Sequence, residues 1–73
     1  MPQIDMIATG KNIKNACKNA GMTIQQMADT IGVTTMACSK WCRGICMPTI
    51  DNMVIICHMF NIKLDDLIVS KIV

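Results

Sequence analysis

Apolar side chains recur along this chain at intervals of three and four residues, the spacing that puts them on one face of an α-helix. The clearest example begins at Thr23, which forms the sequence of a capping box with Gln26 three residues later. The apolar face that follows comprises Ile24, Met27, Ala28 and Ile31. Gly32 then supplies the left-handed residue that commonly ends a helix. We therefore predict a helix between Thr23 and Gly32.

A second helix is predicted directly after this one, from Thr35 to Cys42. Thr34 can cap its start and Gly44 can end it. Its apolar face comprises Cys38, Trp41 and Cys42. Two short helices joined by a turn of three to four residues that contains glycine form a helix-turn-helix, whose second helix can lie in the major groove of DNA.

The same reasoning predicts three more helices. The first follows a cap at Thr9 and ends at Gly21; its inward residues are Ile13, Ala16, Cys17 and Ala20. The fourth follows a cap at Thr49 and ends at Asn61; its inward residues are Ile50, Met53, Ile56, Cys57 and Phe60. The fifth is short and is marked by Leu64, Leu67 and Ile68.

The segments outside these helices are short. Residues 1–8 are expected to form an extended leader, and residues 69–73 an apolar C-terminal tail. No segment shows a convincing two-residue alternation, so the prediction is a single all-α domain of five helices over residues 1–73. The 52% of hydrophobic residues is enough for a core without disulfide bonds.

Charge, hydrophobicity and cysteine content limit the possible binding partners and cellular compartment of the protein. The net charge of +2 and the pI near 8.4 permit DNA binding but do not argue for it, because a nucleic-acid footprint usually brings a pI above about 9. The longest apolar run, residues 53–57, is far short of the roughly 20 residues that span a membrane. The five cysteines are odd in number and mostly at core spacing, so we expect reduced thiols and a cytoplasmic protein.

Taken in order, these motifs resemble the Cro/C1-type (XRE) family of helix-turn-helix repressors over roughly residues 10–69. The matching landmarks are Ile13-Lys14, Gly21-Met22-Thr23, Met27-Ala28, Ile31-Gly32-Val33-Thr34, Trp41-Cys42-Arg43-Gly44, Pro48-Thr49 and Leu67-Ile68. The resemblance implies a lambda-repressor-like five-helix fold and sequence-specific DNA binding, usually as a homodimer that controls transcription.

The resemblance also implies a set of DNA-contacting residues. They are Thr23, Gln25, Thr34, Thr35, Met36, Ser39, Lys40 and Arg43. Lys40 has the chemistry to bind guanine O6 and N7, Thr35 to hydrogen-bond a base or phosphate, and Met36 to pack on a thymine methyl group. Phosphates are expected at the start of the helix after Thr23, with added charge from Lys14. The competing interpretation is that these are ordinary surface residues.

Three positions depart from the family pattern. Ile24 stands where the family often has a phosphate-holding Gln, and Cys17 and Cys42 stand where related repressors can form a buried Arg–Glu pair. Replacing both members of such a pair by apolar groups can leave stability unchanged, whereas replacing one leaves a buried charge unpaired. The double replacement is therefore compatible with the family fold.

Other chemistry finds little support in the sequence. A zinc site could use Cys38, Cys42, Cys46 and His58, but no Cys-x-x-Cys pair occurs, so we expect no metal and no cofactor. A redox role for Cys17 and Cys42 stays open. With one histidine and no phosphate-cradling glycine loop, no catalytic residue is identified, and we expect a protein that is not an enzyme.

The sequence also bears on self-association and on binding to other proteins. Spare apolar residues at Ile55, Met59, Val69, Ile72 and Val73 suggest a homodimer formed through the C-terminal part. Packing of the last two against their own core is the alternative. An alternative function is a protein-interaction module that keeps the fold without binding DNA. It is favoured by the weak net charge, by Ile24 at a phosphate-holding position and by the apolar residues Ile55 and Met59 of the fourth helix.

Overall fold

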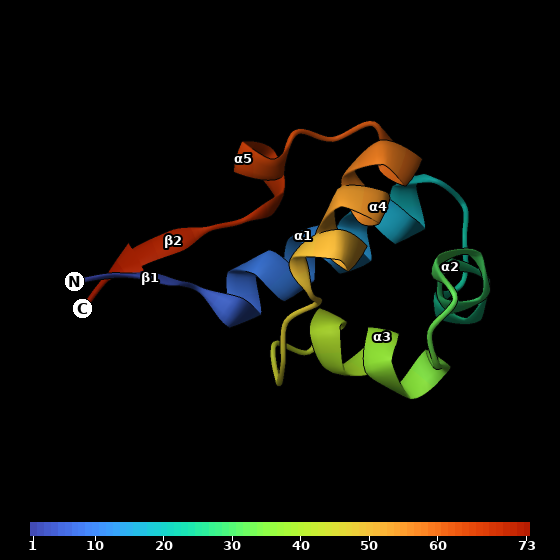
Figure 1. Cartoon of the computed structure of the whole chain (residues 1–73), viewed down its shortest axis with the longest axis horizontal. Coiled ribbons are helices and arrows are strands. Elements are labelled where there is room, and N and C mark those ends of the chain that lie inside the picture. Colours follow the sequence, from blue (N-terminus) through green and yellow to red (C-terminus); the bar gives the residue numbers. More distant parts are fainter.

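The computed structural model describes residues 1–73, which form five helices and one small sheet (Figure 1). The elements are β1 (Pro2–Ile4), α1 (Met6–Asn19), α2 (Ile24–Ile31), α3 (Thr35–Cys42), α4 (Ile50–Phe60), α5 (Leu64–Leu67) and β2 (Ser70–Ile72). The mostly helical architecture confirms the predicted fold class. The sheet was not predicted, and none of the helices is long and apolar enough to cross a membrane.

Helices α2 and α3 begin and end as their sequences indicate. The Gln26 backbone N–H donates to Thr23 Oγ1 at 3.1 Å, and the Thr23 N–H donates to Gln26 Oε1 at 2.8 Å, which completes the capping box. Gly32 ends α2 with a φ of 90°, and Thr34 Oγ1 accepts from the Ala37 N–H at 3.1 Å. These local signals fix the turn between the two helices.

The start of α1 differs from the prediction. The helix begins at Met6, because the Asp5 carboxylate accepts a hydrogen bond from the Ala8 N–H at 3.0 Å and caps it. Thr9 lies inside the helix and is fully buried, and its Oγ1 accepts from the Val69 N–H at 3.0 Å. Asp and Thr are both good capping residues, so a contact sixty residues away decided between them. The extended leader therefore comprises only residues 1–5.

Two residues predicted to face inward are exposed. Ile50, the first residue of α4, is 68% exposed because at 3.6 residues per turn it lies about a quarter of a turn from the middle of the stripe formed by buried Met53 and Ile56. Ala20 is exposed because α1 has already ended at Asn19. Leu64, in the first turn of α5, is also exposed. Both ends of α4 are as predicted: Thr49 caps its start, and Asn61, in the left-handed conformation, ends it.

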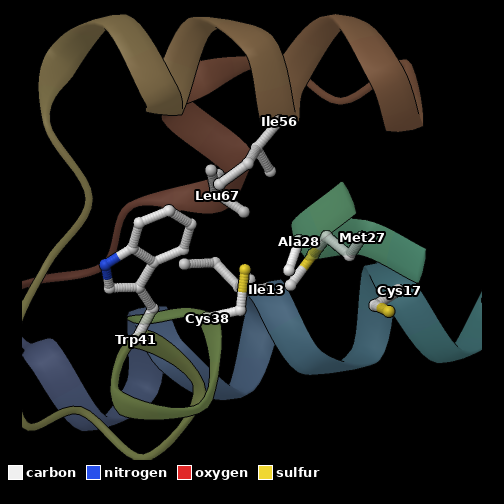
Figure 2. Close-up of a cluster of buried hydrophobic side chains, with 8 residues drawn as sticks. All are labelled: Ile13, Cys17, Met27, Ala28, Cys38, Trp41, Ile56 and Leu67. Atoms are coloured by element: carbon white, nitrogen blue, oxygen red, sulfur yellow. The ribbon is translucent and has the colours of Figure 1, made fainter. Parts of the chain in front are cut away.

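The hydrophobic core lies between α3 and α4 and draws on all five helices (Figure 2). Its members are Ile13, Cys17, Met27, Ala28, Cys38, Trp41, Ile56 and Leu67. No buried side-chain nitrogen or oxygen lacks a hydrogen-bond partner. A core shared by every helix makes the domain one cooperative unit, in which α3 cannot move without disturbing the rest.

The two ends of the chain pair as an antiparallel sheet, with Gln3 opposite Lys71. The Asp5 N–H donates to the Val69 carbonyl at 2.7 Å, and the Val73 N–H to the Met1 carbonyl at 3.0 Å. The tail that was expected to pack on the core or on another copy therefore pairs with the N-terminal strand. Figure 1 shows this sheet extending away from the helices.

Candidate nucleic-acid interface

Helix α3 is held against α1 by an unusually close backbone approach at Gly10. A Cβ atom on this residue would overlap the carbonyl oxygen of Trp41 and lie 2.8 Å from that of Cys42. Cys38 and Trp41, on the inner side of α3, are buried in the core. The helix is therefore fixed in position, as a recognition element that must place side chains against base edges requires.

The outer face of α3 carries most of the residues expected there. Thr35, Met36, Lys40 and Arg43 are exposed, Met36 by 66%, and Ser39 is half-buried. The Arg43 Nε–H donates to the Ser39 carbonyl at 3.4 Å, which keeps the guanidinium group beside the end of the helix. With Lys40 and Arg43 and no carboxylate on α3, this face is positively charged.

The N-terminus of α2 places Thr23 and Gln25 at the surface. The Thr23 Oγ1 accepts the capping hydrogen bond, so its O–H remains able to donate to a phosphate oxygen. The same holds for Thr34 at the start of α3. Ile24 is half-buried and packs against the core, which gives a structural reason for an apolar residue at that position.

The cysteines contribute to the core and to one small group of interacting thiols. Cys17 donates through Sγ to the Met22 carbonyl oxygen at 3.3 Å. Burial, with smaller contributions from the thiols of Cys42 and Cys17, raises the pKa of Cys38 to about 11. Burial also raises the pKa of Cys42, Cys17 raises it further, and Lys14 opposes the shift. These thiols are therefore neutral and weakly nucleophilic at pH 7.

Cys38, Cys42, Cys46 and His58 do not come together as a metal site. No group of three or more His, Cys, Asp or Glu side chains is arranged to hold a metal ion. All five cysteines are free thiols.

Sequence reasoning missed two residues that position the interface. Gly10 stands in the interior of α1, where glycine is unfavourable, and that mismatch was a readable sign of close helix packing. Thr9 was recognised as a capping residue, but nothing in the sequence indicated that its hydroxyl accepts from the Val69 N–H. Both residues fix the environment of α3 and the tail without reaching the surface.

A rigid five-helix domain with an exposed, cationic second helix is the arrangement of a DNA-binding helix-turn-helix protein. Residues 13–67 match the model of the helix-turn-helix family, and the chain therefore belongs to that family, in its XRE group. It is a DNA-binding transcriptional regulator. No match is found among curated proteins.

Solved structures with the same fold include a controller protein, a transcriptional repressor and a transcriptional regulator. The restriction-modification controller protein C.AhdI from Aeromonas hydrophila is 16% identical, with a TM-score of 0.78 over 86% of this chain and 96% of that one. The SOS-response repressor LexA from Eubacterium rectale is 27% identical, with a TM-score of 0.77 over 82% of this chain and 64% of that one. A transcriptional regulator from Listeria innocua is 20% identical, with a TM-score of 0.79 over 97% of this chain and 65% of that one.

Proposed function

We propose that this regulator recognises a specific DNA sequence by placing α3 in the major groove. The observation that carries the proposal is the outer face of α3, where Thr35, Met36 and Lys40 are exposed on a helix fixed to α1 at Gly10. These side chains offer a hydrogen-bonding hydroxyl, an apolar contact for thymine and a cationic donor for guanine. Half-buried Ser39 contributes a second hydroxyl at the side of the groove.

Contacts with the DNA backbone come from residues around α3. The free N–H groups at the start of α2 face solvent beside Thr23 and Gln25 and can bind a phosphate. Thr34 and Arg43 bracket α3 at its two ends and fix its register on the groove. Phosphate contacts position the protein, and the residues between them read the sequence.

We propose further that the protein is a cytoplasmic repressor that binds as a homodimer and catalyses no reaction. One recognition helix reads few base pairs, so specificity improves when two copies read two half-sites related by a two-fold axis. The LexA structure of the same fold is from a transcriptional repressor, which favours repression. Binding of the homodimer would repress by blocking access to the DNA.

A protein-interaction module with this fold is the second candidate. It is favoured by the modest net charge and by the exposed apolar residues Val54 and Ile55 on α4. Titration of random-sequence duplex DNA at two salt concentrations separates the candidates. A DNA-binding protein loses affinity steeply as salt rises, because bound counterions are released on binding. Absence of binding at tens of micromolar at both salt concentrations would favour the interaction module.

Lys40 tests the assignment of α3 directly. We expect Lys40→Ala to weaken binding to the best site by about 1–3 kcal/mol and to relax the preference at one base pair, because Lys40 would contact a base edge. The measurement is affinity for the selected site and for its single-base variants. Lys18→Ala, which removes the same charge from an exposed position of α1, is the control and should leave the preference unchanged. An equal loss on all sequences would make Lys40 a phosphate contact.

A further inference from the structure

Exposed apolar side chains gather at one end of the molecule. We call the paired strands β1 and β2, with Met1 and Val73 beside them, the terminal arm. Its exposed apolar residues include Met1 at 85%, Ile72 at 80% and Val73 at 66%. Ile7, at the base of the arm in the first turn of α1, is 61% exposed. These residues lie together because β1 leads directly into α1 and β2 pairs with β1.

One face of the arm is mostly apolar. Residues directly opposite in an antiparallel pair share a face, so Pro2, Ile4 and Ile72 lie on one face with Ser70, whereas polar Gln3 and Lys71 lie on the other with Met1 and Val73. A solvated two-stranded sheet is at best marginally stable, and one face is usually polar. The arm therefore has the composition of a segment that packs against another surface.

A hollow of about 270 Å³ lies between the arm and the start of α1. Ile4, Ile7 and Gly44 supply much of its lining, and Asp5 and Lys71 supply one charge of each sign. The hollow is open and lies beside the apolar face of the arm, and its two charges balance. Its apolar side chains, Ile4, Met6 and Ile7, offer a surface against which the tip of a second arm can pack.

We propose that the terminal arm and this hollow form the contact with a second copy of the chain, each arm tip packing against the other copy's hollow about a two-fold axis. This inference rests on the proposed binding of two half-sites, and it names the surface that joins the two copies.

The direction of the arm is what makes this surface compatible with one DNA duplex. The arm extends along the longest dimension of the molecule, while the outer face of α3 points across that dimension, away from the core (Figures 1 and 2). A two-fold axis at the arm, parallel to the direction in which α3 faces, leaves both α3 helices on the same side of the dimer. The two molecules then lie end to end.

The spacing of the two copies also fits. The molecule is 35 Å long, so copies joined at the arm have their centres separated by about one molecular length or slightly less. Adjacent half-sites on one face of DNA are about 34 Å apart, one turn of the duplex. The separation of the two centres in an end-to-end dimer is thus comparable with the spacing of two half-sites.

The other apolar surface, on α4, gives the wrong symmetry. Ile50, Val54 and Ile55 form its exposed face, opposite the side that packs on the core. Since α3 lies across the core from α4, a two-fold axis that joins two such faces turns the two α3 helices in opposite directions (Figure 2). Ile55 therefore does not belong to the contact that pairs copies on one duplex, and Met59 is half-buried against the core of its own chain.

The arm does not join two copies by extending the sheet. Pro2 lacks a backbone N–H, so the outer edge of β1 is missing a donor. On β2, edge-to-edge pairing centred on the strand would place Lys71 opposite its own copy. Short strands, Pro and Lys are the features that prevent edge pairing. The contact is consequently one of side chains packing.

Sedimentation equilibrium of the full chain, alone and with a palindromic duplex, tests the proposal. We expect Ile7→Lys and, separately, Ile72→Lys to weaken dimerisation about 30-fold or more, because each places a charge in an apolar contact. Val54→Lys is the matched control, since Val54 is 57% exposed against 61% for Ile7, and it should dimerise like the unmodified chain. Circular dichroism checks that each variant remains folded.

The outcomes separate this inference from the proposed function. A dimer weakened by Val54→Lys but not by the two arm variants would overturn the arm contact while leaving DNA binding intact. So would a chain that stays monomeric at high micromolar concentration and on the palindromic duplex. A dimer that is disrupted by the arm variants but binds no DNA would support the contact and overturn the proposed function.

Discussion

Gly10→Ala is expected to lower the free energy of unfolding by about 2–3 kcal/mol, because the new methyl group must push α3 away from α1. Helix propensity alone predicts the opposite sign, since alanine is favoured over glycine inside a helix by up to about 1 kcal/mol. The two effects can therefore be separated by the direction of the change. Urea-induced unfolding followed by circular dichroism gives the free energy. DNA affinity should fall as well, because α3 carries the recognition residues.

Gly21→Ala is the control for this substitution. Gly21 has a φ of 71° and open space around it, so alanine there meets backbone strain of about 1–2 kcal/mol but no neighbouring atom. It should reduce stability without a specific loss of DNA affinity, since α2 and α3 keep their packing. If Gly10→Ala proves as stable as the unmodified protein or more so, α1 and α3 are not in close backbone contact.

Cys17→Arg is expected to cost about 3–5 kcal/mol in stability, because an arginine would be buried without a partner at a position that is 2% exposed. The cysteine it replaces is satisfied through its hydrogen bond to the Met22 carbonyl. Cys42→Glu alone should cost less, because Cys42 is half-buried and Lys14 lies near enough to oppose the rise in the pKa of Cys42. Unfolding in denaturant measures both.

The double variant Cys17→Arg/Cys42→Glu tests whether the two positions form a pair. The influence of Cys17 on the pKa of Cys42 indicates that the two side chains are close. We therefore expect the double variant to recover at least about 1 kcal/mol relative to the sum of the single changes. Cys38→Ser paired with Cys17→Arg serves as a comparison that offers no carboxylate. Strict additivity in the first pair would show that Cys17 and Cys42 are not coupled.

The helix-turn-helix itself could be predicted from local sequence. The capping box of Thr23 and Gln26, the left-handed Gly32 and the cap at Thr34 all involve hydrogen bonds within a few residues of one another. Interactions of that range depend little on the rest of the chain, and the apolar stripes of α2 and α3 follow the helical period. The exposed positions of Thr35, Met36, Lys40 and Arg43 follow from the same period.

Local patterns were misleading where long-range contacts compete with them. Thr9 has the chemistry of a capping residue, but it lies inside the helix, where its hydroxyl accepts a hydrogen bond from the Val69 N–H. Asp5 caps the start of α1 instead. Ile50 continues an apolar pattern in sequence but lies beyond the buried stripe of α4. In both cases the environment of the side chain depends on which element packs beside it.

The sequence by itself determined the helices, their caps and the family of this DNA-binding regulator, because these depend on contacts between neighbouring residues. The tertiary structure alone decided that the two ends of the chain pair as a sheet, since strands of three residues gain stability only from a partner about seventy residues away. It also decided the close approach at Gly10, because steric fit between two helices depends on their relative placement.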